Sequence, residues 1–247
     1  MSPIKQISIA GFSGKMARLI STSLLQNHPQ IAIHGIARSP EKVSAKLRDS
    51  PKVNLFQASS TDKGAIRKAI AGSQVVICCY LGNESLMVDG QKLLIDACIE
   101  EGVPRYIASD WSLDYRALKM GDLPSKDPMK QVYAYLQDRE KEGKIHGVHV
   151  LNGAFMEVMW ASFMGLFDET VPKFTYWGTG DGKSEMTTMA DAAAYTAEIA
   201  SDPSVTGVVN GKWSMFHVRR WWLTVRSTGR PQICKRVSRT VRKDLWC

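Results

Sequence analysis

The sequence alternates short runs rich in β-branched residues with segments whose apolar residues recur at helical spacing, and this alternation constrains the fold more than any other feature. The expected strands cover residues 5–10, 31–37, 53–57, 75–80, 105–108 and 147–151. The expected helices cover residues 16–25, 41–47, 62–71, 86–101, 129–142 and 189–200. Strands separated by helices of this length form right-handed βαβ units, and therefore a parallel sheet covered on both faces. We expect an α/β fold with a doubly wound parallel sheet.

The basic residues are concentrated near the end of the sequence. Of the 32 Lys and Arg residues that give the chain its net charge of +8, ten lie in residues 212–247, together with one acidic residue. Apolar periodicity is lost there, and such a segment buries too little apolar surface to offset the entropy lost on ordering. We therefore expect a sheet domain over residues 1–152 and a small, incomplete C-terminal substrate lobe over 153–211. Residues 212–247 are expected to be a poorly ordered tail, an alternative or out-of-frame end.

Composition argues against several classes of protein. No apolar run approaches the roughly 20 residues that span a bilayer, and the first residues lack the pattern of a secretory signal, so we expect a cytoplasmic protein without a membrane segment. The five cysteines form no Cys-x-x-Cys pair, so we expect reduced thiols and no metal site. Nucleic-acid binding through Trp213, Trp221 and Trp222 is the weakest alternative, because no recognisable binding module surrounds them.

A glycine turn after the first expected strand has the context of a dinucleotide-binding motif. Gly11-Phe-Ser-Gly14-Lys-Met-Ala17 lies between that strand and the first expected helix. Gly11 permits a tight turn, Gly14 lets the backbone approach a pyrophosphate, and Ala17 is small enough for close packing of the helix. The amides at the start of the helix would bind the phosphates. The segment predicts a Rossmann domain that binds a nicotinamide dinucleotide.

The residue after the second expected strand indicates which dinucleotide is bound. An NAD-selective site is expected to have an acidic side chain there, which accepts a hydrogen bond from the ribose 2′-hydroxyl. This chain has Arg38, whose guanidinium suits a 2′-phosphate. We therefore expect NADP(H) in preference to NAD(H), and a solvated loop arginine is the alternative.

Several segments together resemble one protein family. They cover residues 7–14, 37–42, 62, 105–111, 127–128, 151–157, 176–178 and 186–192. In their order and approximate spacing they resemble the NmrA-like and isoflavone reductase-like branch of the atypical short-chain dehydrogenases, and the fungal members most. The resemblance covers roughly residues 4–208. It implies a Rossmann fold, bound NADP(H), and either a small-molecule substrate or a regulatory partner protein.

The resemblance also implies a set of cofactor contacts along the glycine turn and the strand ends. They are Gly11, Phe12, Ser13, Gly14, Lys15, Met16, Arg38, Ser59, Cys79, Tyr80, Leu81, Asn152 and Phe155. Arg38 would hold the 2′-phosphate, and Asn152 and Phe155 would line the nicotinamide side. A purely structural role is the alternative for Cys79 and Tyr80 at a buried strand end, and also for Asn152 and Phe155.

A lysine at the start of the fifth expected helix is the proton donor that the resemblance implies. In reductases of this family an aliphatic residue follows the lysine by three positions. Here that residue is Val132, so Met129 fills the lysine position and Lys130 is its neighbour. A thioether cannot transfer a proton, so Lys130 is the candidate, although a shift of one residue turns a side chain by about 100° around a helix.

A second pattern offers another catalytic pair. Tyr115 and Lys119 have the spacing of a Tyr-x-x-x-Lys motif, which on a helix places phenol and ammonium side by side and lowers the phenol pKa.

His146 and His149 lack partners for a nucleophilic or metal site, so we expect them to be solvated or core histidines.

Two functions stay open from the sequence. The first is an NADPH-dependent reductase of a small carbonyl or enone compound, and Ser109 at the end of the fifth expected strand favours it. The second is a non-catalytic NADP(H) sensor that binds a partner protein, and Met129 favours that alternative.

Overall fold

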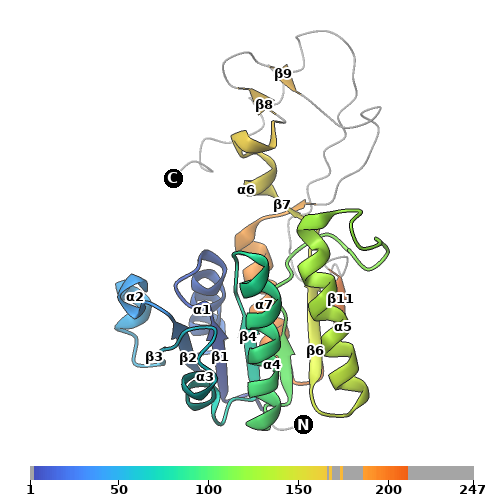
Figure 1. Ribbon diagram of the computed structural model, residues 1–247. Helices are drawn as coiled ribbons and strands as arrows, with labels where there is room; N and C mark the ends of the chain where they lie inside the picture. Colours follow the sequence, from blue (N-terminus) through green and yellow to red (C-terminus); the bar gives the residue numbers. More distant parts are fainter. Residues whose placement is uncertain (1–2, 166, 169–172, 175–185, 211–247) are drawn as a thin grey trace.

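The structure, a computed structural model, describes residues 3–165, 167–168, 173–174 and 186–210. Its main element is a seven-stranded parallel sheet with the strand order β11-β6-β5-β4-β1-β2-β3 (Figure 1). The strands are β1 Gln6–Ala10, β2 Ala32–Ala37, β3 Val53–Gln57, β4 Val75–Cys78, β5 Arg105–Ile107, β6 His146–Leu151 and β11 Gly207–Asn210. The chain builds outward from β1 to β3 and then crosses back to β4, so the doubly wound α/β fold is confirmed.

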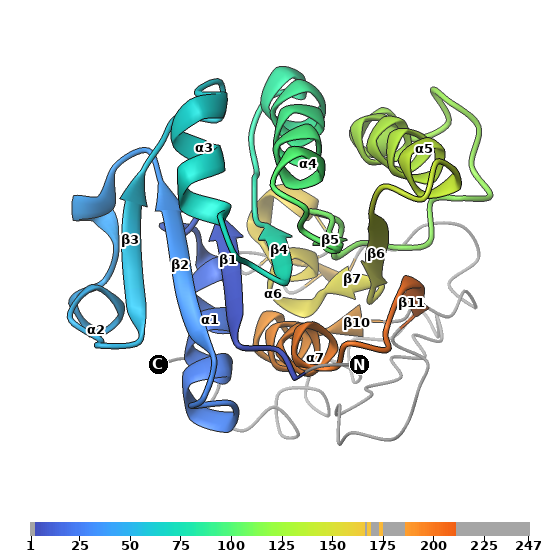
Figure 2. The same ribbon diagram turned by 90° about the horizontal axis from the view of Figure 1, so that it is seen from below.

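Helices cover both faces of the sheet (Figure 2). One face carries α1 Lys15–Asn27, α2 Ala45–Arg48 and α7 Met189–Ser201, and the other carries α3 Lys63–Ile70, α4 Gln91–Glu100 and α5 Asp127–Lys141. Alternate strand residues point into the two cores: Ile7 and Ile9 belong to the core beneath α1 and α7, whereas Ala10 and Val76 belong to the core beneath α3 and α4. Burial on both faces explains the nearly continuous apolar runs in the sequence.

The remaining described elements are short. They are η1 Pro40–Lys42, η2 Leu86–Gly90, η3 Pro124–Lys126, β7 Ala154–Phe155, α6 Met156–Met159, η4 Ser162–Met164, β8 Phe167–Asp168, β9 Lys173–Phe174 and β10 Met186–Thr187. β7 follows the carboxyl end of β6 and pairs in parallel with β10, which leads into α7. In Figure 1, α6, β8 and β9 project beyond this end of the sheet.

Two late elements return to the sheet although they follow residue 152. α7 packs in the core shared with α1, and β11 pairs in parallel with β6. The sequence does not predict β11, because an apolar pair at Val208 and Val209 is too short to show a period. The division at residue 152 into a sheet domain and a separate lobe stays a prediction, and the expected tail at 212–247 lies outside the described residues.

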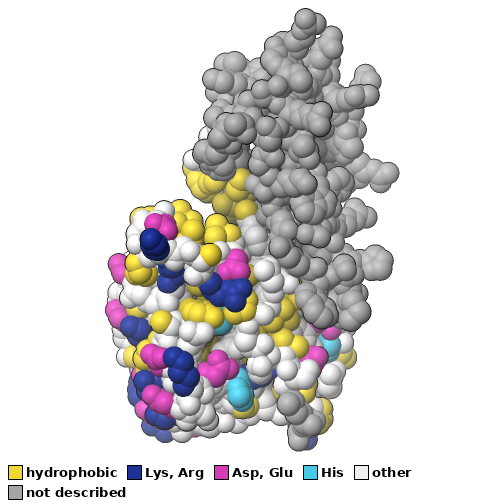
Figure 3. All heavy atoms as spheres, turned by 90° about the vertical axis from the view of Figure 1, so that its right-hand side faces the viewer, with side chains coloured by type: hydrophobic (Ala, Val, Ile, Leu, Met, Phe, Trp, Pro, Cys, Tyr) yellow, Lys and Arg dark blue, Asp and Glu magenta, His cyan; other side chains and the backbone are white. Residues whose placement is uncertain are grey.

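The surface of the described part carries mixed charges. On the face shown in Figure 3, Lys and Arg side chains are interspersed with Asp and Glu. This face does not present the continuous positive surface typical of nucleic-acid binding. Among the helices in the described ranges, none combines the length and apolar character needed to cross a membrane.

A buried arginine ties α7 to the start of β5. Arg105 begins β5, and only 4% of it is exposed. Its guanidinium donates hydrogen bonds to the backbone carbonyls of Ile199 at 3.1 Å, Ala200 at 2.8 Å, Asp202, and Val205 at 3.3 Å. The last carbonyls of a helix have no partners within the helix, and they carry the negative end of its dipole. Arg105 therefore caps α7 and holds the turn into β11 against β5.

We predict that Arg105→Met lowers the free energy of unfolding by at least about 2 kcal/mol, because several buried carbonyls lose their charged donor. Arg48→Met is the matched control, since Arg48 and its partner Asp49 are both exposed, and it should cost less than about 0.5 kcal/mol. Urea denaturation of the two variants measures both values. Unchanged stability in Arg105→Met would contradict the capping role.

Candidate functional site

The glycine turn lies at the carboxyl end of β1, where the strand order reverses between β2 and β4. Gly11 has a φ of +76°, and the Gly14 amide donates a hydrogen bond to the Gly11 carbonyl at 2.9 Å. Gly14 immediately precedes α1, and no side chain caps the first amides of that helix. Parallel sheets bind ligands at such a reversal, and uncapped amides at a helix start attract anions.

The turn also lies very close to the end of β4. A Cβ atom at Gly11 would lie 2.7 Å from the carbonyl oxygen of Cys79, and one at Gly14 would lie 3.1 Å from the carbonyl oxygen of Gly11. Any side chain at Gly11 would push the turn away from β4. The bare backbone and the uncapped amides therefore fit a pyrophosphate, which needs close approach of the main chain.

The other turn residues divide between the core and the surface. The Phe12 side chain is 1% exposed, and it lies over Gly35, where an added Cβ would be 2.5 Å from Phe12 Cδ1. Met16 is partly buried against the same core, whereas Ser13 and Lys15 are exposed. A contact from Phe12 to a cofactor can therefore involve only its backbone.

Arg38 and Ser59 are exposed beyond the carboxyl ends of neighbouring strands. Arg38 follows the last residue of β2, and its carbonyl accepts a hydrogen bond from Gln57 Nε2 at 3.4 Å. Its guanidinium forms no ion pair with any residue in the described ranges. Ser59 Oγ lies 3.1 Å from Thr61 Oγ1. The structure thus leaves the Arg38 guanidinium available to an external anion.

Cys79 and Tyr80, which follow β4, are buried and pack against the glycine turn. Cys79 and Tyr80 are 9% and 8% exposed, and the Cys79 amide donates to the Ala10 carbonyl at 2.8 Å. Burial raises the pKa of the Cys79 thiol well above its ordinary value, so this thiol stays neutral. Ser109 Oγ donates to the Tyr80 carbonyl at 2.7 Å. Leu81, by contrast, is 89% exposed and is the only one of the three expected contacts here with an accessible side chain.

Asn152 places an amide without a partner at the carboxyl end of β6. It is 6% exposed, and neither Oδ1 nor Nδ2 makes a hydrogen bond within the described structure. Ser112 Oγ is also buried without a described partner, and the Gly153 amide donates to the Ser112 carbonyl at 3.2 Å. Buried polar groups are normally hydrogen-bonded. An amide that offers both donor and acceptor fits the carboxamide of a nicotinamide, and Phe155 packs partly buried nearby in the core of α1 and α7.

Lys130 and Met129 lie in the first turn of α5. Lys130 Nζ is 4.0 Å from Asp127 Oδ1, and it is buried without a hydrogen bond to the described residues. Met129 is half-buried. The role of Lys130 as proton donor stays a prediction.

The prediction that Tyr115 and Lys119 form an alternative catalytic pair is wrong. Residues 111–120 are not helical, and Tyr115 is 1% exposed whereas Lys119 is exposed. The Tyr115 hydroxyl donates to Asp110 Oδ1 at 3.0 Å. Burial and the adjacent Asp110 carboxylate raise the pKa of Tyr115, which is the opposite of the expected activation.

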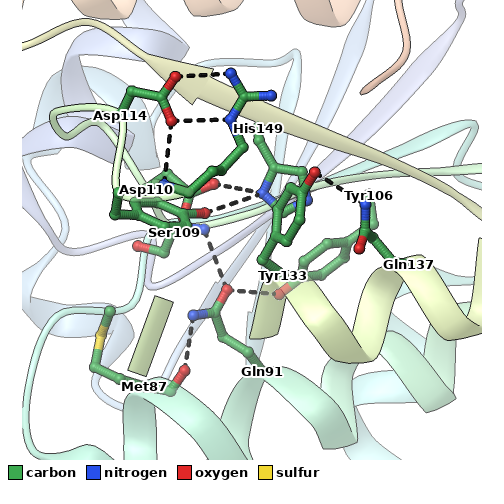
Figure 4. Close-up of polar contacts among 11 residues, drawn as sticks. Met87, Gln91, Tyr106, Ser109, Asp110, Asp114, Tyr133, Gln137 and His149 are labelled. Atoms are coloured by element: carbon green, nitrogen blue, oxygen red, sulfur yellow. Dashed lines mark hydrogen bonds and ion pairs between the residues drawn. The ribbon is translucent and has the colours of Figure 1, made fainter. Parts of the chain in front are cut away.

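Tyr115 instead belongs to a buried network that the sequence does not predict. Figure 4 labels Asp110, His149, Tyr133 and Gln137 of this network. His149 Nδ1 lies 2.7 Å from Asp110 Oδ2 and 3.5 Å from the Tyr115 hydroxyl. The Tyr133 ring of α5 packs on the His149 ring with 4.6 Å between centroids, and Gln137 donates to the Tyr133 hydroxyl at 2.9 Å. His149 is thus a core histidine, as expected, but one with polar partners. The network joins the ends of β5 and β6 to α5.

A second polar cluster joins β5 to α4. Gln91 Oε1 accepts hydrogen bonds from the Tyr106 hydroxyl and from the Ser109 amide, both at 3.1 Å (Figure 4).

Two residues after Ser109, Trp111 has a φ of +38°, the only positive value among the described residues other than glycine. Its indole donates to Thr196 Oγ1 at 2.9 Å. The positive φ of Trp111 points its indole toward α7, while the neighbouring Asp110 side chain faces the network.

Comparison with known proteins identifies the family. A family model described as NAD(P)H-binding matches residues 11–203. The chain belongs to this NAD(P)H-binding family. The match begins at Gly11 and includes the turn, Arg38, Asn152 and α7.

Curated relatives are named as reductases. The chain is 26% identical over 202 residues to a probable pinoresinol-lariciresinol reductase of Arabidopsis thaliana. The matched region covers 80% of this chain and 64% of that protein. It is 29% identical over 164 residues to an isoflavone reductase of Glycine max, a match that covers 62% of this chain and 47% of that protein. It is 24% identical over 144 residues to an NmrA-like family domain-containing oxidoreductase of Aspergillus, a match that covers 54% of this chain and 42% of that protein. The chain thus spans less than two thirds of each relative, and the isoflavone reductase-like and NmrA-like resemblance is confirmed at this coarse level.

A solved structure confirms the fold. It is an NADPH-dependent quinone oxidoreductase of Escherichia coli complexed with NADPH, with a TM-score of 0.66 and 22% identity over 82% of this chain and 67% of that one. No cluster of three potential metal ligands occurs in the part of the chain that the structure describes.

We predict that Gly11→Ala weakens NADPH binding by at least about tenfold, because the new methyl would meet the Cys79 carbonyl and displace the turn. Gly102→Ala is the matched control: Gly102 also has a positive φ, of +67°, but a Cβ there would have no neighbour within 4 Å. The control should cost about 1 kcal/mol of stability and leave binding unchanged. Fluorescence titration with NADPH and thermal denaturation separate the two effects, and equal affinities in both variants would contradict the close approach.

Proposed function

We propose that the protein is an NADPH-dependent reductase of a small carbonyl or enone compound. The observation that carries the proposal is the glycine turn at the uncapped start of α1, packed against the Cys79 carbonyl, with Arg38 exposed at the end of the next strand. Membership of the NAD(P)H-binding family supports the cofactor class, and the names of the curated relatives support reduction.

The residues of the chain divide the cofactor between them. The amides of the turn and of the first turn of α1 would hold the pyrophosphate. The Arg38 guanidinium would pair with the 2′-phosphate, and the Asn152 amide would pair with the carboxamide. When bound, reduced nicotinamide supplies a hydride for the substrate.

The substrate class is proposed from the relatives and from the reaction. Isoflavones and quinones both contain a carbonyl conjugated to a double bond, and proteins named for their reduction share this fold. A non-catalytic sensor, which Met129 favours, would bind NADPH equally well but turn over no substrate. Turnover therefore separates the two functions.

Arg38 provides the test of cofactor choice. We predict that the protein binds NADPH at least about tenfold more tightly than NADH, about 1.4 kcal/mol, and that Arg38→Ala removes most of this difference. Arg48→Ala, which removes an exposed arginine of α2, should preserve it. Calorimetric titration with both nucleotides gives the affinities. If the unmodified protein binds them equally, the assignment of Arg38 is wrong.

Turnover tests the reductase activity. Loss of NADPH absorbance is followed with para-nitrobenzaldehyde, cyclohexenone and menadione as an aldehyde, an enone and a quinone. We predict turnover of at least one compound class. NADPH binding without turnover of any of them would contradict the reductase and favour the sensor.

A further inference from the structure

Gln91 connects an irregular helical turn to the sheet through its side-chain amide. It is 1% exposed and lies where η2, a single π-helical turn, continues into α4. In a regular α-helix the Gln91 backbone amide would donate to the Met87 carbonyl four residues earlier, but here it donates to the Val88 carbonyl. The side chain takes over this bond, because Gln91 Nε2 donates to the Met87 carbonyl at 2.8 Å. Gln91 thus satisfies the irregular turn from which its own side chain projects.

The other end of the same amide holds the chain after β5. Gln91 Oε1 accepts hydrogen bonds from the Tyr106 hydroxyl and the Ser109 amide, both at 3.1 Å (Figure 4). A carbonyl can only accept and a backbone N–H can only donate, so just one orientation of the Gln91 amide satisfies its three partners. Gln91 therefore fixes the position of Ser109 relative to η2 with directional bonds in a buried place.

A side chain joins the strands where their ladder stops. β4 and β5 pair as far as Ile77 and Ile107. Beyond these residues, Ser109 Oγ donates to the Tyr80 carbonyl at 2.7 Å and so links the segment after β5 to the segment after β4. Because Gln91 holds the Ser109 amide, the position of the Tyr80 backbone depends on Gln91 through one intermediate residue.

Tyr80 lies between the glycine turn and η2. A Cβ atom at Gly11 would be 3.4 Å from Tyr80 Cδ1 and 2.7 Å from the Cys79 carbonyl oxygen. A Cβ atom at Gly90, in η2, would be 3.5 Å from Tyr80 Cε2. In such a close-packed place a shift of the backbone at Cys79 and Tyr80 would displace the glycine turn.

We propose that Gln91 is a positioning residue for the bound dinucleotide. Acting through Ser109, it holds the Tyr80 backbone, and with it the Cys79 carbonyl, where the glycine turn can present its amides to the pyrophosphate. Because Gln91 is buried, it acts through these hydrogen bonds and not through contact with the nucleotide. The inference rests on the cofactor of the proposed function.

Conservative substitutions separate this role from general support of the core. Ser109→Ala removes the bond to Tyr80, and Gln91→Met removes the amide but keeps an unbranched side chain. We predict that each weakens NADPH binding by at least about threefold, because the backbone after β4 loses a buried hydrogen-bonded support. Tyr106→Phe is the matched control: it also removes a buried hydrogen bond of Gln91, so it should lower the melting temperature but leave the NADPH affinity unchanged. Calorimetric titration and thermal denaturation measure both quantities, and equal weakening by Tyr106→Phe would overturn the proposal.

Two further variants test whether Gln91 works through Ser109. In the double variant, Gln91→Met should add little to Ser109→Ala, so NADPH binds within about twofold of the weaker single variant. Gln91→Glu keeps an oxygen that can accept from the Ser109 amide, so it should restore most of the affinity lost in Gln91→Met. Single losses that multiply in the double variant would overturn the proposal.

A fragment of the cofactor locates the effect. Adenosine 2′-phosphate carries the phosphate assigned to Arg38 but no pyrophosphate, so Ser109→Ala and Gln91→Met should bind it as tightly as the unmodified protein does. A loss as large as that for NADPH would place the effect outside the glycine turn and overturn the proposal. If the unmodified protein binds no NADPH, the proposed function is wrong and the role of Gln91 with it. If it binds NADPH and both single variants bind it equally well, only the role of Gln91 is wrong.

Discussion

The structure depends on the contact between the glycine turn after β1 and the backbone that follows β4. Gly11 brings its backbone so close to the Cys79 carbonyl that no Cβ fits between them. This contact fixes the start of α1 above the junction of β1 and β4, and it determines where the uncapped amides of the helix point. The anion site proposed here would thus be made mostly from main chain, whose position is set by packing of buried strands on both sides.

Around this backbone site, the side chains differ in how they are held. Arg38 is exposed at a strand end, and its conformation is open to a ligand. Asp110, His149 and Tyr115 are locked by mutual hydrogen bonds inside the protein. Asn152 lies between these extremes, because it is buried but has no described partner for its amide. The site therefore combines a rigid support with a few groups whose hydrogen bonds are left for a ligand.

Sequence periodicity was sufficient for six of the seven strands of the sheet, all but β11, because strands buried on both faces leave continuous apolar runs and the glycines mark the turn. It was insufficient wherever a role depends on a distant partner. The Phe12 ring fills the space over Gly35, a packing relation that local spacing cannot show, and a contact of its backbone with the cofactor stays a prediction. Tyr115 was paired with Lys119 on an assumed helix, whereas its partner Asp110 lies in a non-helical segment that turns at Trp111. His149 meets Asp110 across 39 positions, and only the adjacency of β5 and β6 brings them together.

The clamp formed by Arg105 has a consequence for synthesis of the chain. Its four acceptors follow it by 94 to 100 positions, so the guanidinium at the start of β5 has none of these partners while the first half of the protein leaves the ribosome. A buried cation without partners is strongly unfavourable, so β5 cannot settle permanently beside β4 until α7 has been translated. The glycine turn, although encoded near the start of the gene, therefore becomes part of a stable domain only late in translation.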